Sequence, residues 1–221
     1  MQMDLRLLCK ISEAMIRKYL LPISIILNIS LITLVFQLRD KIYAQIFPAS
    51  KVNILLIGDS LLAQENWSSL LNRNDLKNDA FGGAITQQII WNIERGQLIN
   101  NPKIVVIDGG INDLLSGIPT QRVFKNYQQI IKVLSEKKIK IIAHLILYTT
   151  DNEKINKEIF ILNFLLKEYF ESRKVEFIDM NLQLSDHKKL KKNLSIDGIH
   201  LRKGAYKMWA NQLKSKLPQE L

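Results

Sequence analysis

Hydrophobic and polar positions follow two patterns along most of the chain: short continuous apolar runs, and longer stretches with apolar residues every three or four positions. The short runs are rich in β-branched residues and end at polar turns, which is typical of strands buried on both faces. They cover 52–57, 104–107, 139–143 and 175–178, with a further edge strand expected near 76–81. The helix-like stretches cover about 62–72, 85–95, 120–136, 152–171 and 202–216. This alternation predicts an α/β fold, a three-layer α/β/α sandwich around a central, mainly parallel five-stranded sheet.

A longer apolar segment precedes this region. From Tyr19 to Leu38 no residue is charged, and a helix of 20 residues spans about 30 Å, the thickness of a bilayer core. We therefore expect a basic leader at 1–18, a transmembrane helix or signal anchor at 19–38, and a linker at 39–50. A cleaved secretory signal peptide and a buried core helix are the alternatives. Basic residues are slightly more frequent before the span than after it, which favours a position outside the cytoplasm for the domain that follows the span.

The amino-acid composition excludes few classes of binding partner. The 221 residues carry a formal net charge of +10, with the lysines spread along the chain. Such a charge favours contact with anionic surfaces, but it also fits a solvated lysine-rich surface. The interleaved aromatic residues and glycines of a nucleic-acid module are absent, so we expect no nucleic-acid partner. The sole cysteine, Cys9, excludes an intrachain disulfide.

Four polar, glycine-bearing turns follow predicted strands or precede the last helix. In a parallel sheet, the carboxyl ends of the strands lie at one edge, and ligands bind there. We therefore expect these turns to meet and to form the functional site. They are Gly58-Asp59-Ser60-Leu61, Phe81-Gly82-Gly83-Ala84, Gly109-Gly110-Ile111-Asn112-Asp113 and Asp197-Gly198-Ile199-His200-Leu201.

In this order, the four turns resemble the conserved blocks of the SGNH hydrolases, also called the GDSL lipase/esterase family. Each block alone is too short to be specific, but the ordered set, with each block at a strand end, is specific. The resemblance covers about residues 51–217 and implies a flavodoxin-like SGNH hydrolase fold. It also implies a serine ester hydrolase, although a family does not settle the substrate.

The resemblance assigns roles to individual residues. Ser60 matches the nucleophile, His200 the general base and Asp197 the carboxylate that orients the histidine. The three-residue separation on one loop lets Asp197 reach Nδ1 of His200, while Nε2 faces Ser60. The implied oxyanion hole consists of the Ser60 N–H, the Gly83 N–H and the side-chain amide of Asn112.

Some of these polar residues have simpler structural roles as alternatives. Asp59 is expected to hold its turn through its side chain, and Asn112 taken alone would be a helix N-cap. His144 lies in a predicted strand and is expected to be buried, whereas His187 is expected in a solvated loop. The turns contain no phosphate-binding loop or paired acidic motif, so we expect neither a metal nor a cofactor.

Three functions remain open at this stage. The first is an extracytoplasmic esterase that cleaves O-acyl esters of a glycan or lipid. The second is a membrane-tethered O-acyltransferase that uses the same triad, and the third is a non-catalytic binding module on the same fold, which the complete triad disfavours. Lysines close in sequence to the Asp197–His200 loop either attract anionic substrates or form a solvated surface; they are Lys188, Lys189, Lys191 and Lys192. The sequence does not indicate an oligomeric state.

Overall fold

The computed structural model describes residue 18 and residues 21–46, 52–99 and 101–219. The chain divides into two units, Met1–Ser50 and Lys51–Leu221. In the first unit, helix α2 spans Leu21–Ile46, and large apolar side chains between Ile23 and Leu38 are exposed. Over the residues that the structure describes, no helix combines the length and the apolarity that a membrane span requires. Most of the predicted leader, and the first two residues of the predicted span, lie outside the described residues, so the membrane helix at 19–38 stays a prediction.

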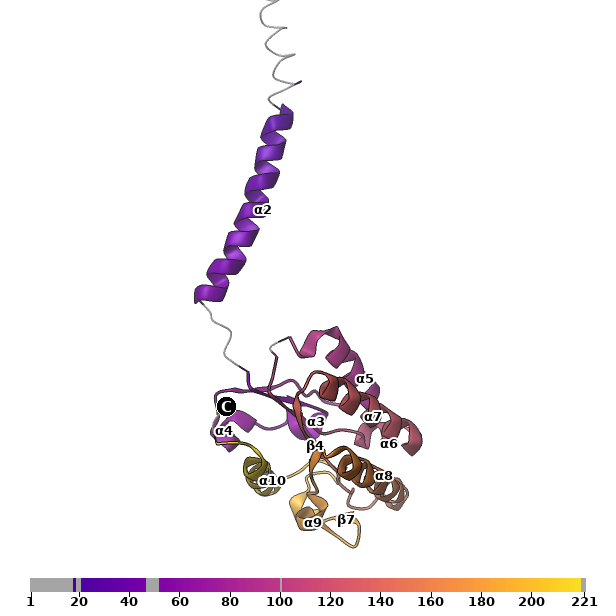
Figure 1. Ribbon diagram of the computed structural model, residues 1–221. Coiled ribbons are helices and arrows are strands. Elements are labelled where there is room, and N and C mark those ends of the chain that lie inside the picture. The colour runs from indigo at the N-terminus through magenta and orange to yellow at the C-terminus, as the bar shows by residue number, and fades with distance from the viewer. Residues whose placement is uncertain (1–17, 19–20, 47–51, 100, 220–221) are drawn as a thin grey trace, which may run out of the picture. The chain divides into compact units, whose positions relative to one another are not determined.

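The second unit is built around a five-stranded sheet in the order β2-β1-β3-β4-β5. Figure 1 shows helices on both sides of this sheet. All four strand pairs are parallel. The strands are β1 (Ile54–Ile57), β2 (Leu76–Asn78), β3 (Ile104–Ile107), β4 (Lys140–His144) and β5 (Glu176–Ile178). Strands β1 and β3 are buried at every position because helices cover both faces of the sheet. The predicted α/β class and the three-layer sandwich are confirmed.

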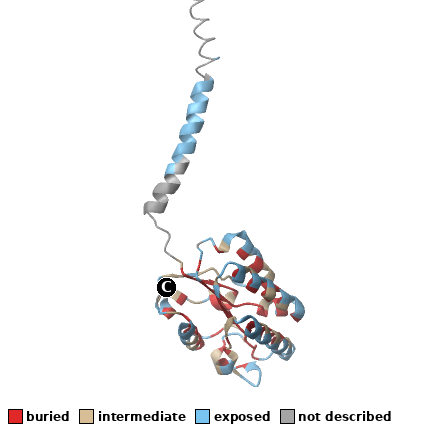
Figure 2. Ribbon diagram, in the orientation of Figure 1, coloured by how far each residue is buried: buried red, intermediate tan, exposed pale blue. Residues whose placement is uncertain are grey.

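Helices cover the two faces of the sheet and enclose two separate apolar cores (Figure 2). Helices α5, α7 and α8 pack on one face, whereas α4 and α10 pack on the other. The helices are α3 (Ser60–Ala63), α4 (Trp67–Leu71), α5 (Thr86–Asn92), α6 (Ile111–Leu115), α7 (Thr120–Glu136), α8 (Glu153–Arg173), α9 (Asn181–Leu184) and α10 (Lys203–Lys216). A π-helix at Ile93–Gln97 extends α5, and a 3-10 turn spans Lys192–Leu194.

Two local features differ from the predicted elements. The helix expected at 62–72 is split into α3 and α4, because Asn66 caps a new helix by accepting a hydrogen bond from the Ser69 N–H. The region around His187 forms a small antiparallel hairpin of β6 (Ser185–Asp186) and β7 (Lys189–Leu190). His187 is exposed at its turn, as expected of a solvated position.

Candidate active site

Ser60 begins helix α3 directly after strand β1, so it lies at the carboxyl edge of the sheet. Asp59 caps this helix, and its Oδ1 accepts a 2.9 Å hydrogen bond from the Leu61 N–H. The expectation that Asp59 holds the turn is thus confirmed. The turn is also tightly packed, because a Cβ on Gly58 would lie 2.3 Å from the carbonyl oxygen of Asp108. Only glycine fits at that position.

His200 and Asp197 approach Ser60 from the loop that precedes helix α10. His200 Nε2 lies 2.9 Å from Ser60 Oγ, and His200 Nδ1 lies 2.6 Å from Asp197 Oδ2. The second oxygen of Asp197 accepts the N–H groups of Ile199 and His200 at 3.0 and 2.8 Å. One carboxyl group therefore holds both the ring and the backbone of the histidine. The structure brings together the three residues that the sequence predicted to meet.

The protonation of this row follows from its hydrogen bonds. Burial acts to raise the pKa of Asp197, but hydrogen bonds from the His200 side chain and from the His200 and Ile199 backbone lower it to about 2. Asp197 is therefore an ionised acceptor at neutral pH. In the tautomer that carries its proton on Nδ1, the ring donates to Asp197 and offers the lone pair of Nε2 to the Ser60 hydroxyl. An imidazole held in this tautomer can remove a proton from the hydroxyl.

Gly83 and Asn112 come from the second and third of the four turns. Gly83 has a φ of +75°, and a Cβ on it would meet no atom within 4 Å, so this loop faces open space. Asn112 lies inside α6, whose N-cap is Gly110, so the alternative of a capping role for Asn112 is wrong. Its Nδ2 donates a 3.0 Å hydrogen bond to the Ala84 carbonyl, next to Gly83. One amide hydrogen links the two turns, and the other has no partner among the described residues.

A buried hydrogen-bond network connects these two turns beneath the site. Asp113 accepts the backbone N–H and the hydroxyl of Thr86 at 2.8 and 2.5 Å, and Asn126 donates to the same hydroxyl at 2.8 Å. All three side chains are buried, and they join α5, α6 and α7. Thr86 and Asn126 were not predicted as site residues, because their partners are distant in sequence and lie on other helices.

Two carboxyl groups are buried behind Ser60. Asp59 and Asp108 are 0% and 3% exposed, and among the described residues Oδ2 of each has no hydrogen-bond partner. Burial raises the pKa of Asp59 to about 6, against the opposing effects of the Leu61 N–H and His200. Burial, and then the charge of Asp59, raise the pKa of Asp108 well above its ordinary value. In the part of the chain that the structure describes, no three His, Cys, Asp or Glu residues are grouped as metal ligands.

An aromatic cluster joins the Ser60 side of the site to the His200 side. The Trp209 N–H on α10 donates a 2.8 Å hydrogen bond to His144 Nε2, and burial lowers the pKa of His144 to about 3. His144 is therefore a neutral core residue, as expected. Trp67 packs edge-on against Trp209, with ring centroids 5.4 Å apart, and donates to the Leu62 carbonyl on α3. The helix that begins at Ser60 and the helix that follows His200 are thus held by the same cluster.

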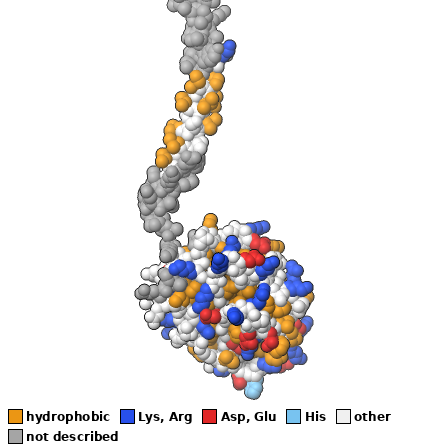
Figure 3. Space-filling view, viewed as in Figure 1, with side chains coloured by type: hydrophobic (Ala, Val, Ile, Leu, Met, Phe, Trp, Pro, Cys, Tyr) orange, Lys and Arg blue, Asp and Glu red, His pale blue; other side chains and the backbone are white. Residues whose placement is uncertain are grey.

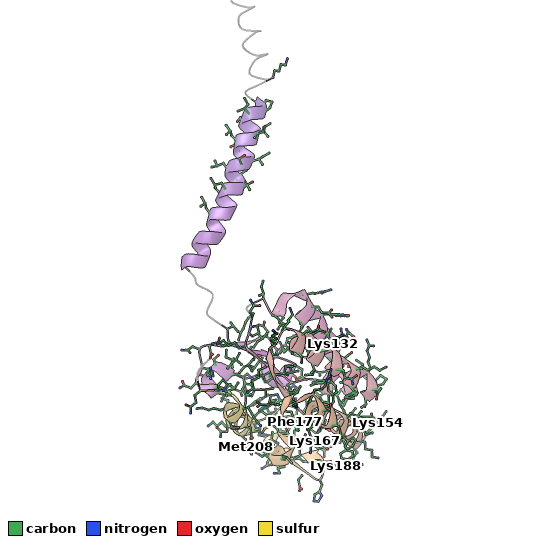
Figure 4. All side chains as sticks on the ribbon, viewed as in Figure 1. Lys132, Lys154, Lys167, Phe177, Lys188 and Met208 are labelled. Carbon is green, nitrogen blue, oxygen red and sulfur yellow. The ribbon has the colours of Figure 1, made fainter. Side chains whose placement is uncertain are left out.

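The lysines near the Asp197–His200 loop each contact a neighbouring group. Lys188 lies 3.5 Å above the ring of Phe160, and Lys191 donates to the Gln183 carbonyl. Two ion pairs complete the set: Lys189 with Glu153 at 2.8 Å, and Lys192 with Asp151 at 2.9 Å. Figure 4 labels Lys188 on the hairpin, and Figure 3 shows basic and acidic side chains interspersed on the face in view. Lys188 and Lys189 thus tie the hairpin to α8, whereas Lys191 and Lys192 contact α9 and the loop before α8.

Comparison with known proteins identifies relatives of the second unit. Residues 56–208 match the GDSL-like lipase/acylhydrolase family. An N-acylneuraminate cytidylyltransferase of Streptococcus agalactiae is 26% identical over 181 residues, which cover 78% of this chain and 42% of the relative. The chain therefore spans less than half the length of that curated relative.

Two solved structures share the fold. A GDSL-like lipase from Bacteroides thetaiotaomicron is 18% identical, with a TM-score of 0.68 over 80% of this chain and 97% of the other. An acetylxylan esterase from Geobacillus stearothermophilus is 15% identical, with a TM-score of 0.64 over 75% and 95%. Identities this low establish the fold alone. Because the family match covers more than half of the sequence, this chain belongs to the GDSL-like lipase/acylhydrolase family of ester hydrolases.

Proposed function

We propose that the chain hydrolyses O-acyl esters through an acyl intermediate on Ser60. The observation that supports this most directly is the geometry of the three side chains: Ser60 Oγ lies 2.9 Å from His200 Nε2, and His200 Nδ1 lies 2.6 Å from Asp197 Oδ2. In this proposal Ser60 is the nucleophile, His200 the general base and Asp197 the carboxylate that orients and stabilises the ring.

The proposed reaction has two halves. Ser60 Oγ attacks the ester carbonyl while His200 Nε2 takes the hydroxyl proton, and His200 then protonates the leaving alcohol. Water, activated by the same imidazole, next releases the acyl group and restores Ser60. The tetrahedral oxyanion accepts hydrogen bonds from the Ser60 N–H, the Gly83 N–H and the free amide hydrogen of Asn112. A donor of this kind contributes about 3 to 4 kcal/mol to transition-state stabilisation.

We propose an O-acyl group on a carbohydrate as the substrate, with an ester lipid as the alternative. The names of two similar proteins support a carbohydrate, since one acts on N-acylneuraminate and the other is an acetylxylan esterase. The open loop at Gly82 and Gly83, where added Cβ atoms would meet nothing within 4 Å, leaves room for a bulky alcohol part.

Membrane attachment and a position outside the cytoplasm are also proposals. They are supported by the uncharged stretch from Tyr19 to Leu38 and by the exposed apolar side chains of α2. Attachment would keep the catalytic unit close to cell-surface glycans or to lipid esters.

The test is covalent labelling of the full chain with a fluorophosphonate, beside Ser60→Ala and a matched control, Ser69→Ala, at an exposed serine on α4. We expect labelling of the wild type and the control but none of Ser60→Ala, with the label on the peptide that contains Ser60. Hydrolysis of acetylated oligosaccharides and of phospholipid esters then separates the two substrate classes. A folded wild type that neither reacts with the probe nor hydrolyses any ester would refute the proposal.

A further inference from the structure

Within the loop that carries Asp197 and His200, one buried hydroxyl group forms hydrogen bonds to two backbone positions. Ser195 is 4% exposed, and its Oγ accepts a 2.8 Å hydrogen bond from the Gly198 N–H. The same oxygen donates its proton to the His200 carbonyl at 3.0 Å. A serine hydroxyl has one hydrogen to donate, so both bonds together fix its orientation.

The backbone around this hydroxyl is also held at both ends. The His200 carbonyl accepts a second hydrogen bond, 2.8 Å long, from the Ile196 N–H, and Ser195 forms an antiparallel bridge with Leu201. At the top of the loop, Gly198 has a φ of +99° and its carbonyl accepts the Thr150 N–H at 3.0 Å. The Ser195 hydroxyl is thus a second side-chain link within this loop, and it joins the Gly198 N–H to the His200 carbonyl, whereas Asp197 accepts the N–H groups of Ile199 and His200.

We infer that Ser195 is a positioning residue that sets His200 at the correct distance from Ser60, an inference that rests on the proposed function. Asp197 fixes the ring of His200 relative to the loop, but it moves with the loop. Ser195 instead fixes the loop's own shape, and hence the direction in which Nε2 points. A displacement of about 1 Å between reacting groups can reduce a rate by about a hundredfold.

The experiment compares Ser195→Ala with Ser195→Thr, which keeps a hydroxyl, and with Ser185→Ala. Ser185 is a matched control because its partly buried hydroxyl bonds to Asn181, outside the loop. We expect Ser195→Ala to lower kcat about tenfold to a hundredfold, with KM within about twofold, because binding does not depend on the position of the base. Ser195→Thr should recover most of the loss, and Ser185→Ala should match the wild type.

A second readout reports the loop directly and does not require activity. The proton between His200 Nδ1 and Asp197 Oδ2, in a bond of 2.6 Å, is expected at low field in the proton NMR spectrum. Ser195→Ala should shift or broaden this resonance in a chain that still unfolds cooperatively. An unchanged kcat in Ser195→Ala would overturn the inference, as would a fall in kcat with the resonance unmoved. If the wild type itself lacks esterase activity, the proposed function fails, and the resonance still tests whether Ser195 sets the loop.

Discussion

The buried carboxyl group of Asp59 makes the stability of the protein depend on pH in a specific window. An aspartate ordinarily ionises near 3.8, and burial behind Ser60 raises the pKa of Asp59 to about 6. Between these values the folded protein keeps a proton that the unfolded chain releases. The free energy of unfolding therefore falls as pH rises through the window, and Asp59 contributes about 3 kcal/mol of this fall, since each pKa unit is worth about 1.4 kcal/mol.

Below the window both states are protonated and the cost is absent; above it both are ionised and the cost is complete. The asparagine in Asp59→Asn cannot ionise, so the part of the pH dependence of the unfolding free energy that comes from Asp59 should disappear. The amide oxygen can still accept the Leu61 N–H, while the new Nδ2 takes the place of an oxygen that has no partner among the described residues. An unpaired buried donor costs about 1 to 3 kcal/mol. Absolute stability near neutral pH should therefore change little, and the slope is the informative quantity.

The assay is urea unfolding followed by tryptophan fluorescence at several pH values between 4 and 7. Asp75→Asn is the control with the opposite sign, because the hydrogen bond from Arg73 lowers the pKa of Asp75 to about 2. Asp75 stabilises the fold at pH values above its unfolded-state pKa of 3.8, and this contribution is lost as the pH falls toward 2. The Asp75→Asn variant should therefore keep the dependence of the unfolding free energy on pH that the wild type shows above pH 4. A slope in Asp59→Asn equal to that of the wild type would refute the reasoning.

Three further predictions concern the site and the first unit. Asn112→Ala should lower kcat by about a hundredfold to a thousandfold with little change in KM, measured by ester hydrolysis, because one oxyanion donor is lost. Gly198→Ala should lower both the unfolding midpoint and kcat, because its φ is +99° and a Cβ would lie 2.9 Å from Thr150 Oγ1; wild-type values for both would contradict this. Deletion of residues 1–50 should move the protein from the membrane fraction to the supernatant of a cell lysate, and an unchanged distribution would count against the predicted anchor.

The sheet and most helices were predictable because their patterns are local. Helix α7 has the predicted bounds of 120–136, since its apolar positions recur at helical spacing after Pro119. The position of Ser60 at the carboxyl edge of the sheet was predictable because it follows a parallel strand, whereas its pairing with His200, which lies in the loop before α10, was implied by the family resemblance. The C-terminal end of α2 could not be predicted in this way, because the helix continues to Ile46, beyond the charged residues at 39–41 that end the apolar stretch. Hydropathy marks the apolar part of a helix, not its end.

Other features depend on contacts between distant segments and left no local pattern. Asp108 stands in an Asp-Gly-Gly sequence that indicates an exposed turn, yet it is 3% exposed because helices on both sides cover the strand end. The hairpin at 185–190 is short and polar, and β7 is tied to the rest of the fold by the bond from the Leu190 N–H to the Thr149 carbonyl. Ser195 could have been singled out only as a small polar residue two positions before Asp197.

The proposed triad is assembled from the two ends of the second unit. Ser60 and His200 are 140 residues apart, and the base lies just before the final helix. During translation Ser60 therefore emerges long before His200, and under the proposed mechanism a nascent chain halted before residue 197 should not hydrolyse an ester. Proteolytic removal of the last helix would also remove Trp209, whose ring packs against Trp67 and holds α10 to the rest of the unit. If Ser60 and His200 act as proposed, ester hydrolysis would report that helix α10 and the loop before it have docked, which makes activity a simple reporter for folding of the second unit.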